Sequence, residues 1–100
     1  MSKVKHVVLL KLKEGTTEEQ ITKFFDDVLE LSETVPGIDD YVSGTNSSSE
    51  GLSQGMSHAF IMTFSDSAAR DAYVVHPEHE RFKATGMTIV ENLLVFDFEV

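Results

Sequence analysis

The sequence predicts an α+β fold: a ferredoxin-like βαββαβ chain with one four-stranded antiparallel sheet and helices on one face. Two observations predict it. Segments with a two-residue hydrophobic period alternate with segments of helical period in that order. The first and last strands are apolar on both faces, although helices can cover only one face of such a sheet. The 100 residues suit one domain, residues 1–100.

The first strand is expected over residues 3–13, which read KVKHVVLLKLK. Alternate residues from Val4 to Leu12 share one face, and Val7 and Leu9 lie on the other. The period of two and the β-branched residues favour a strand. Because both faces are apolar in the middle, both of them need to be covered.

The first helix is predicted over residues 18–34. Thr17 stands three residues before Gln20, which is the spacing of a capping box. Apolar residues then recur at helical spacing until the Pro-Gly pair at 36–37 ends the pattern. Pro77 interrupts the second helical region, and Gly86 is expected to end it. The further expected elements are strands at 38–45, 57–64 and 93–100 and helical pieces at 68–73 and 78–84.

The face of the sheet that the helices leave open is expected to be an interface. It is too hydrophobic to stay in water, and an apolar patch of this kind usually marks a contact surface. A homodimer packed through the sheet face with two-fold symmetry would cover it. Such a dimer would also enlarge a core that is small for a chain of 100 residues.

The composition excludes several classes of protein. A formal charge of −9 argues against nucleic-acid binding, because phosphate backbones repel it. The absence of cysteine rules out disulfides, thiolate zinc sites and iron–sulfur clusters. No apolar run approaches the roughly 20 residues of a membrane-spanning helix, and no signal peptide is recognisable. We therefore expect a cytoplasmic protein without membrane contact.

The motif Tyr-x-x-His-Pro-x-His, which carries Tyr73, His76 and His79, is the strongest chemical candidate. It brings a phenol and two imidazoles to one corner. An imidazole can transfer protons near neutral pH, and a tyrosine hydroxyl can donate to a developing oxyanion. On spacing alone the structural alternative is favoured, in which His76 caps a helix end and Tyr73 anchors the corner.

The other two histidines, His6 and His58, lie on apolar strand faces. A histidine in such a place is more often a satisfied core residue than a ligand. The antiparallel topology places the two toward opposite ends of the sheet, so a cluster of all four histidines is not expected. We expect neither a metal site nor a cofactor, since no ligand-spacing or nucleotide-binding motif is present.

Several motifs together resemble the stress-responsive A/B barrel (Dabb) domain family. They are the opening strand at 4–13, the segment at 55–58 with Phe-Ser at 64–65, the Tyr-His motif at 73–79 and the Asp-Phe pair at 97–98. The resemblance covers essentially the whole chain. It implies a ferredoxin-like monomer and a homodimer whose two sheets face each other as a dimeric α+β barrel.

The family includes plant stress proteins, bacterial proteins without assigned activity and a plant polyketide cyclase that works by cofactor-free aldol condensation. That resemblance implies His79 as general base, Tyr73 as the group that holds the substrate carbonyl, and His6 and His58 as pocket residues. Aromatic residues of the cyclase pocket, or of the usual family pattern, are replaced here by Val28, Met56 and Val90. This difference implies a pocket shaped for another ligand.

Two functions stay open. The first is a dimeric stress-related domain that binds a small apolar or carbonyl-containing ligand between sheet and helices. The second is a cofactor-free enzyme of the polyketide-cyclase type, which requires an open cavity faced by both Tyr73 and His79. A filled core around Tyr73 would favour the first. The residues expected to line the ligand pocket are His6, Val8, Leu10, Phe25, Val28, His58, Phe60, His76 and Phe82.

Overall fold

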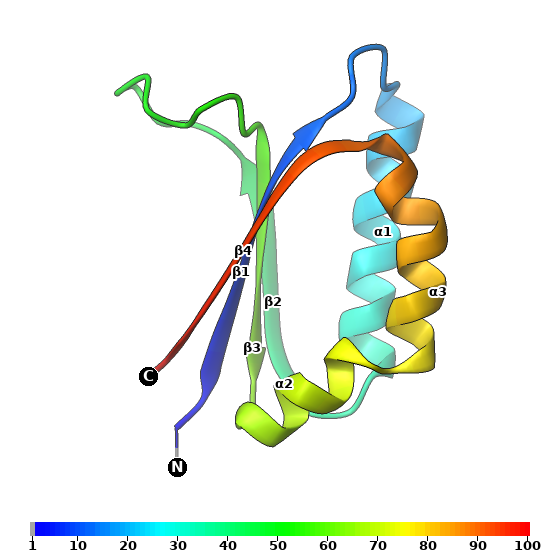
Figure 1. Cartoon of the computed structure of the whole chain (residues 1–100), viewed down its shortest axis with the longest axis vertical. Helices are drawn as coiled ribbons and strands as arrows, with labels where there is room; N and C mark the ends of the chain where they lie inside the picture. The colour runs from blue at the N-terminus through cyan, green and yellow to red at the C-terminus, as the bar shows by residue number, and fades with distance from the viewer. Residues whose placement is uncertain (1) are drawn as a thin grey trace.

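The computed structural model describes residues 2–100 and has the expected βαββαβ order, with the second helical region split in two. Strands and helices follow one another along the chain in the order that the hydrophobic periods predict (Figure 1). The elements are β1 (Val4–Leu12), α1 (Glu18–Thr34), β2 (Ile38–Thr45), β3 (His58–Phe64), α2 (Ser67–Val74), α3 (Pro77–Gly86), a 3₁₀ turn (Met87–Ile89) and β4 (Val90–Glu99).

The four strands form one antiparallel sheet in the order β2-β3-β1-β4. All helices lie on one side of it, with α1 and α3 side by side and α2 near the end that holds both termini (Figure 1). Val4 pairs with Phe64, so the start of β1 lies beside the end of β3. His6 and His58 are therefore separated along the sheet, as the topology predicts.

The core lies between the sheet and the helices. In β1 every second residue from Val4 to Leu10 is buried, which matches the side-chain period of a strand with one face on the core. Burial of a side chain such as Leu10 or Phe64 contributes roughly 1.5–3 kcal/mol. The buried apolar residues are Val4, Val8, Leu10, Phe24, Val28, Leu31, Val35, Phe60, Met62, Phe64, Tyr73 and Phe82.

Helix α1 begins and ends where the sequence predicts. The Thr17 side chain accepts a hydrogen bond from the Gln20 backbone N–H, and the Gln20 side chain accepts one from the Thr17 N–H at 2.8 Å, which completes the capping box. After the helix, Gly37 turns the chain into β2 with a φ of +89°. A Cβ at this position would stand 2.6 Å from the Cβ of Ala69. Gly37 is therefore required both for its positive φ and for the lack of space beside Ala69.

The C-terminal part differs from the expectation at the start of β4. Helix α3 ends at Gly86, as expected, and a separate 3₁₀ turn at Met87–Ile89 follows it. The missing side chain of Gly86 makes room for Phe82, whose ring atoms lie as close as 2.7 Å to where a Cβ would be. Strand β4 then starts at Val90, three residues earlier than predicted, because Val90 pairs with Leu12.

The side of the sheet away from the helices carries a large apolar surface. Pairing of β4 with β1 places Leu94, Phe96 and Phe98 on the face that also carries Val7 and Leu9. Phe96 is 62% exposed and Phe98 is 47% exposed. We call this side the open face; the residues that define it are Lys5, Val7, Leu9, Val42, Ala59, Ile61, Thr63, Leu94, Phe96 and Phe98. Within residues 2–100, no helix is long and apolar enough to cross a membrane.

Candidate functional site

Three elements bring Tyr73, His6 and His79 together on the helix side of the sheet. Tyr73 comes from α2, His6 from β1 and His79 from α3. The Tyr73 and His79 rings stack with centroids 4.2 Å apart, and the His6 and Tyr73 rings meet nearly at right angles at 5.9 Å. Phe64 packs against both His6 and Tyr73. We call His6, Tyr73 and His79 the ring cluster.

Hydrogen bonds decide which ring nitrogen carries the proton in two of these residues. His79 Nδ1 lies 3.1 Å from the carbonyl oxygen of Val74, which can only accept. His6 Nδ1 lies 2.7 Å from Oδ1 of Asp97, a carboxylate that also accepts. Both rings therefore donate from Nδ1, and in the neutral form each has an unprotonated Nε2 that can take a proton.

Burial sets the charge states of Tyr73 and His79. Burial raises the pKa of Tyr73 far above its usual value, so its hydroxyl stays protonated and able to donate. Burial also lowers the pKa of His79, an effect that the Val74 carbonyl partly offsets. At neutral pH the cluster thus places the Tyr73 hydroxyl, a hydrogen-bond donor, next to the neutral His79 imidazole, whose Nε2 can act as a base.

Two charged residues that were not predicted as site residues, Asp97 and Arg70, lie behind His6. Asp97 of β4 is opposite His6 in the strand register, and its second oxygen, Oδ2, lies 3.0 Å from Nη1 of Arg70. Arg70 of α2 also bonds Asp71 at 2.7 Å. The interruption of an apolar strand by Asp97 was the available signal, but only the β1–β4 register connects it with His6.

The remaining two histidines have different surroundings. His76 caps α3: its Nδ1 accepts the backbone N–H of Glu78 at 3.1 Å, as the structural alternative predicts. His58 lies at the other end of the sheet, where its Nδ1 is 2.7 Å from the Ser57 hydroxyl and its ring stacks on Phe25 at 5.5 Å. The Tyr73 side chain shares no hydrogen bond with His76, because α2 ends at Val74.

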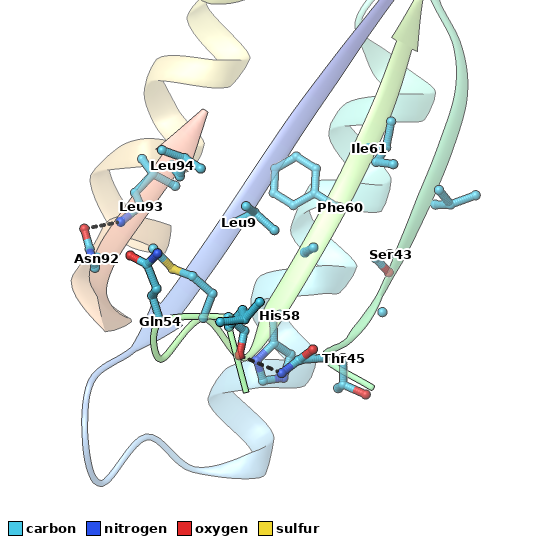
Figure 2. Close-up of a pocket in the computed structure, with 17 residues that line it drawn as sticks. Leu9, Ser43, Thr45, Gln54, His58, Phe60, Ile61, Asn92, Leu93 and Leu94 are labelled. Carbon is cyan, nitrogen blue, oxygen red and sulfur yellow. Dashed lines mark hydrogen bonds between the residues drawn. The ribbon is translucent and has the colours of Figure 1, made fainter. Parts of the chain in front are cut away.

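The largest cavity described here lies at the loop end of the sheet and has a volume of about 600 Å³. Figure 2 shows its labelled side chains coming from all four strands and from the loop before β3. A second cavity of about 380 Å³ lies between α1 and β2. His58 and the β2 segment 43–45 line both of them, so His58 stands where the two cavities meet.

The predicted pocket residues are divided among several places. His58 and Phe60 line the larger cavity, and Phe25 and His58 line the smaller one. Phe82 lines a third cavity, of about 280 Å³ between α1 and α3, and a fourth of about 200 Å³ lies close to it. The predicted residues that line none of these four cavities are His6, Val8, Leu10, Val28, Tyr73, His76 and His79.

Tyr73 and His6 are buried in this conformation, whereas His79 is partly exposed. Tyr73 is only 2% exposed and His6 only 8%. A substrate would reach the Tyr73 hydroxyl only after neighbouring side chains or α2 had moved. Over residues 2–100, no group of three or more histidine, aspartate or glutamate side chains is arranged to hold a metal ion.

Comparison with known proteins agrees with this fold. The family model of the stress responsive A/B barrel domain, Dabb, matches residues 4–100. The chain belongs to this family. The resemblance inferred from the sequence motifs is thereby confirmed, as is the ferredoxin-like fold class.

Two curated relatives and one solved structure span nearly the same length. The chain is 30% identical to olivetolic acid cyclase of Cannabis sativa over 95 residues, which covers 95% of this chain and 94% of that protein. It is 31% identical over 96 residues to a stress-response A/B barrel domain-containing protein of Arabidopsis thaliana, covering 96% and 85%. A dimeric ferredoxin-like protein of unknown function from Jannaschia sp. CCS1 has a TM-score of 0.85 at 30% identity, covering 98% and 99%.

Proposed function

We propose that this Dabb protein is a homodimer that binds a small apolar or carbonyl-containing molecule between its sheet and helices. The smaller cavity, which His58 and Phe25 line between α1 and β2, carries the proposal; His58 also borders the larger cavity of the strands and the loop. Phe25 offers an aromatic face there, while Ser43 and Thr45 add hydroxyl groups. A mainly apolar cavity with a few convergent polar groups is typical of small-molecule sites, and an imidazole can donate to a carbonyl oxygen.

The dimer is supported by the open face. Phe96 and Phe98 are too exposed for a stable monomer surface of this kind, and they are continuous with Val7 and Leu9. The Jannaschia relative is described as dimeric. The larger cavity lies on the open-face side of the sheet, where Leu9, Ile61 and Leu94 line it, so a second copy packed on this face would also close that cavity.

The second candidate function is cofactor-free acid–base catalysis on a carbonyl compound. Its support is the 4.2 Å stack of Tyr73 on a neutral His79, together with the similarity to olivetolic acid cyclase. In this function, His79 Nε2 removes a proton next to a carbonyl group, and the Tyr73 hydroxyl donates to the enolate oxygen that forms. The closed packing of Tyr73 requires opening before such a reaction, which is why ligand binding ranks first.

One experiment separates the two candidates. Thermal stabilisation is measured across a panel of β-diketones, linear ketones and aromatic ketones, with the matching alcohols and hydrocarbons as controls. The proteins are the wild type, His58→Ala and His79→Ala. Ligand binding to the folded state raises the melting temperature by mass action.

If the ligand binds at the cavities, His58→Ala removes the stabilisation and His79→Ala keeps it. If the ring cluster is the site, the two variants behave in the opposite way. Stabilisation that is equal in all three proteins, or absent in the wild type with every compound, would refute both sites for this class of ligand.

A further inference from the structure

The charged side chains behind His6 form a continuous chain from α2 to β1. Arg70 Nη1 lies 3.0 Å from Asp97 Oδ2, and Asp97 Oδ1 lies 2.7 Å from His6 Nδ1. All three side chains are partly buried, with exposed fractions of 26%, 22% and 10% from Arg70 to His6. A shielded carboxylate that uses both oxygens is held more firmly than one in a surface ion pair.

We propose that Arg70 and Asp97 are positioning residues that make His6 a second proton acceptor in the ring cluster. This inference rests on the second candidate function, acid–base chemistry at Tyr73 and His79, and extends it to residues that nothing in the family comparison assigns. Asp97 fixes the proton on Nδ1 of His6, and this leaves Nε2 unprotonated in the neutral ring.

Arg70 has a double role in this arrangement. Its guanidinium pairs with Oδ2 of the Asp97 carboxylate and orients it, so that Oδ1 remains available to His6. Arg70 also stands three residues before Tyr73 on α2, so the same ion pair ties the helix that carries Tyr73 to strand β4. Breaking the ion pair is therefore expected to disturb His6 and the Tyr73 side of the cluster together.

Asp97 compensates the charge that forms when His6 accepts a proton. When His6 Nε2 takes a proton from the carbon next to the carbonyl group of a bound compound, the electron pair of the broken C–H bond passes into the enolate, whose oxygen accepts from the Tyr73 hydroxyl. The His6 ring becomes an imidazolium that still donates from Nδ1 to Asp97. The negative carboxylate then stabilises the positive ring. Arrangements in which a carboxylate orients a histidine through Nδ1 work in this way in general acid–base catalysis.

Nuclear magnetic resonance of the ring nitrogens tests the proposal directly. Two-bond ¹H–¹⁵N correlation spectra of the full chain at mildly alkaline pH show which nitrogen of each neutral histidine is protonated. His6→Gln identifies the His6 signals by their loss. The variants are Arg70→Gln, which removes the charge, and Arg70→Lys, which restores it.

A matched control is available in Arg81→Gln. Arg81 forms an ion pair with Glu78 on α3, at 2.8 Å, and this pair does not involve His6. Asp97→Asn adds a second test that keeps the size of the side chain. The ring signals of His58 serve as an internal reference in every variant, because His58 lies at the other end of the sheet and its Nδ1 contacts the Ser57 hydroxyl.

We expect His6 in the wild type to be protonated at Nδ1 and unprotonated at Nε2. Arg70→Gln and Asp97→Asn should shift His6 toward the Nε2-protonated form, whereas Arg70→Lys and Arg81→Gln should leave it as in the wild type. A wild-type His6 protonated at Nε2 would overturn the proposal. So would spectra of Arg70→Gln and Asp97→Asn that match the wild type.

The magnetic resonance result for His6 does not depend on whether the ketone panel stabilises the protein. If the ketone panel stabilises neither the wild type nor any variant while His6 shows the expected signals, the positioning of His6 stands and the proposed function fails. If His79→Ala removes ligand stabilisation but Arg70→Gln leaves the His6 signals unchanged, the function stands and this inference fails.

Discussion

Partner atoms determine the proton position in three of the four histidines. His6 and His79 donate from Nδ1 to acceptors, whereas Nδ1 of His76 accepts a backbone N–H and so has no proton of its own. This difference separates a structural histidine from two that have a base available at Nε2. The sequence motif alone could not make the distinction, because it depends on where α2 ends and α3 begins.

The partial burial of His79 predicts a pH dependence of stability. Its pKa is lowered in the folded protein, mainly by burial, from an ordinary value of 6.5. As the pH falls through 6.5, the unfolded chain therefore binds the proton first, and stability that is present above this pH is lost. We expect the free energy of unfolding to decrease less between about pH 7 and pH 5 in His79→Gln than in the wild type.

Urea denaturation of both proteins at a series of pH values measures this difference. The other titrating groups are common to the two chains, so the difference between the curves isolates His79. Curves that stay parallel through this range would show that His79 titrates in the folded protein as it does in the unfolded chain.

At the scale of elements, local signals predict much of the fold. The capping pair Thr17 and Gln20 and the Pro-Gly pair at 36–37 fix both ends of α1, because each signal acts within one turn of chain. The start of β4 was predicted three residues too late, since its first residue, Val90, is set by pairing with Leu12 of a distant strand. The link from Arg70 through Asp97 to His6 joins three elements and requires the strand register.

The capping box at the start of α1 gives a stability prediction. Thr17→Ala removes the acceptor of the Gln20 N–H and should lower the free energy of unfolding by about 1 kcal/mol. Thr22→Ala is the control, because Thr22 is exposed in the same helix and alanine favours helix formation. Urea denaturation of both variants compares them, and a Thr22→Ala protein less stable than Thr17→Ala would contradict the assignment of the cap.

The turn between α1 and β2 gives a second stability prediction. Gly37 and Gly15 both have a positive φ, but a Cβ meets Ala69 at 2.6 Å only at Gly37. Gly15→Ala should therefore cost only the backbone strain, roughly 1–2 kcal/mol, and Gly37→Ala clearly more. Denaturant unfolding measures both variants. An equal cost at the two positions would mean that α2 moves away freely from this turn.

At the scale of the whole molecule, one helix layer covers one face of the sheet and leaves the other apolar. The hydrophobic pattern of the first and last strands predicts this arrangement, since alternate residues of a strand point to opposite faces. The hydrophobic pattern cannot predict which ligand fits the cavities, because cavity shape depends on side chains from α1, β2, β3 and the loop before β3 together.

Charge introduced on the open face should separate the two copies. Phe96→Asp places a carboxylate among Val7, Leu9 and the other side chains of this face, where it would be buried without a partner in a dimer. Val75→Asp is the matched control, because Val75 is 73% exposed at the end of α2 on the helix side. Sedimentation velocity should show monomers for Phe96→Asp and dimers for Val75→Asp; dimers in both would place the interface elsewhere.

The mass of the wild-type protein in solution tests the central claim most directly, namely that this chain is one half of a shared barrel. Size-exclusion chromatography with light scattering at micromolar concentration measures it without a label or a ligand. We predict about twice the 11.1 kDa of a single chain, because burial of the open face drives association. A mass of one chain at this concentration would contradict the account.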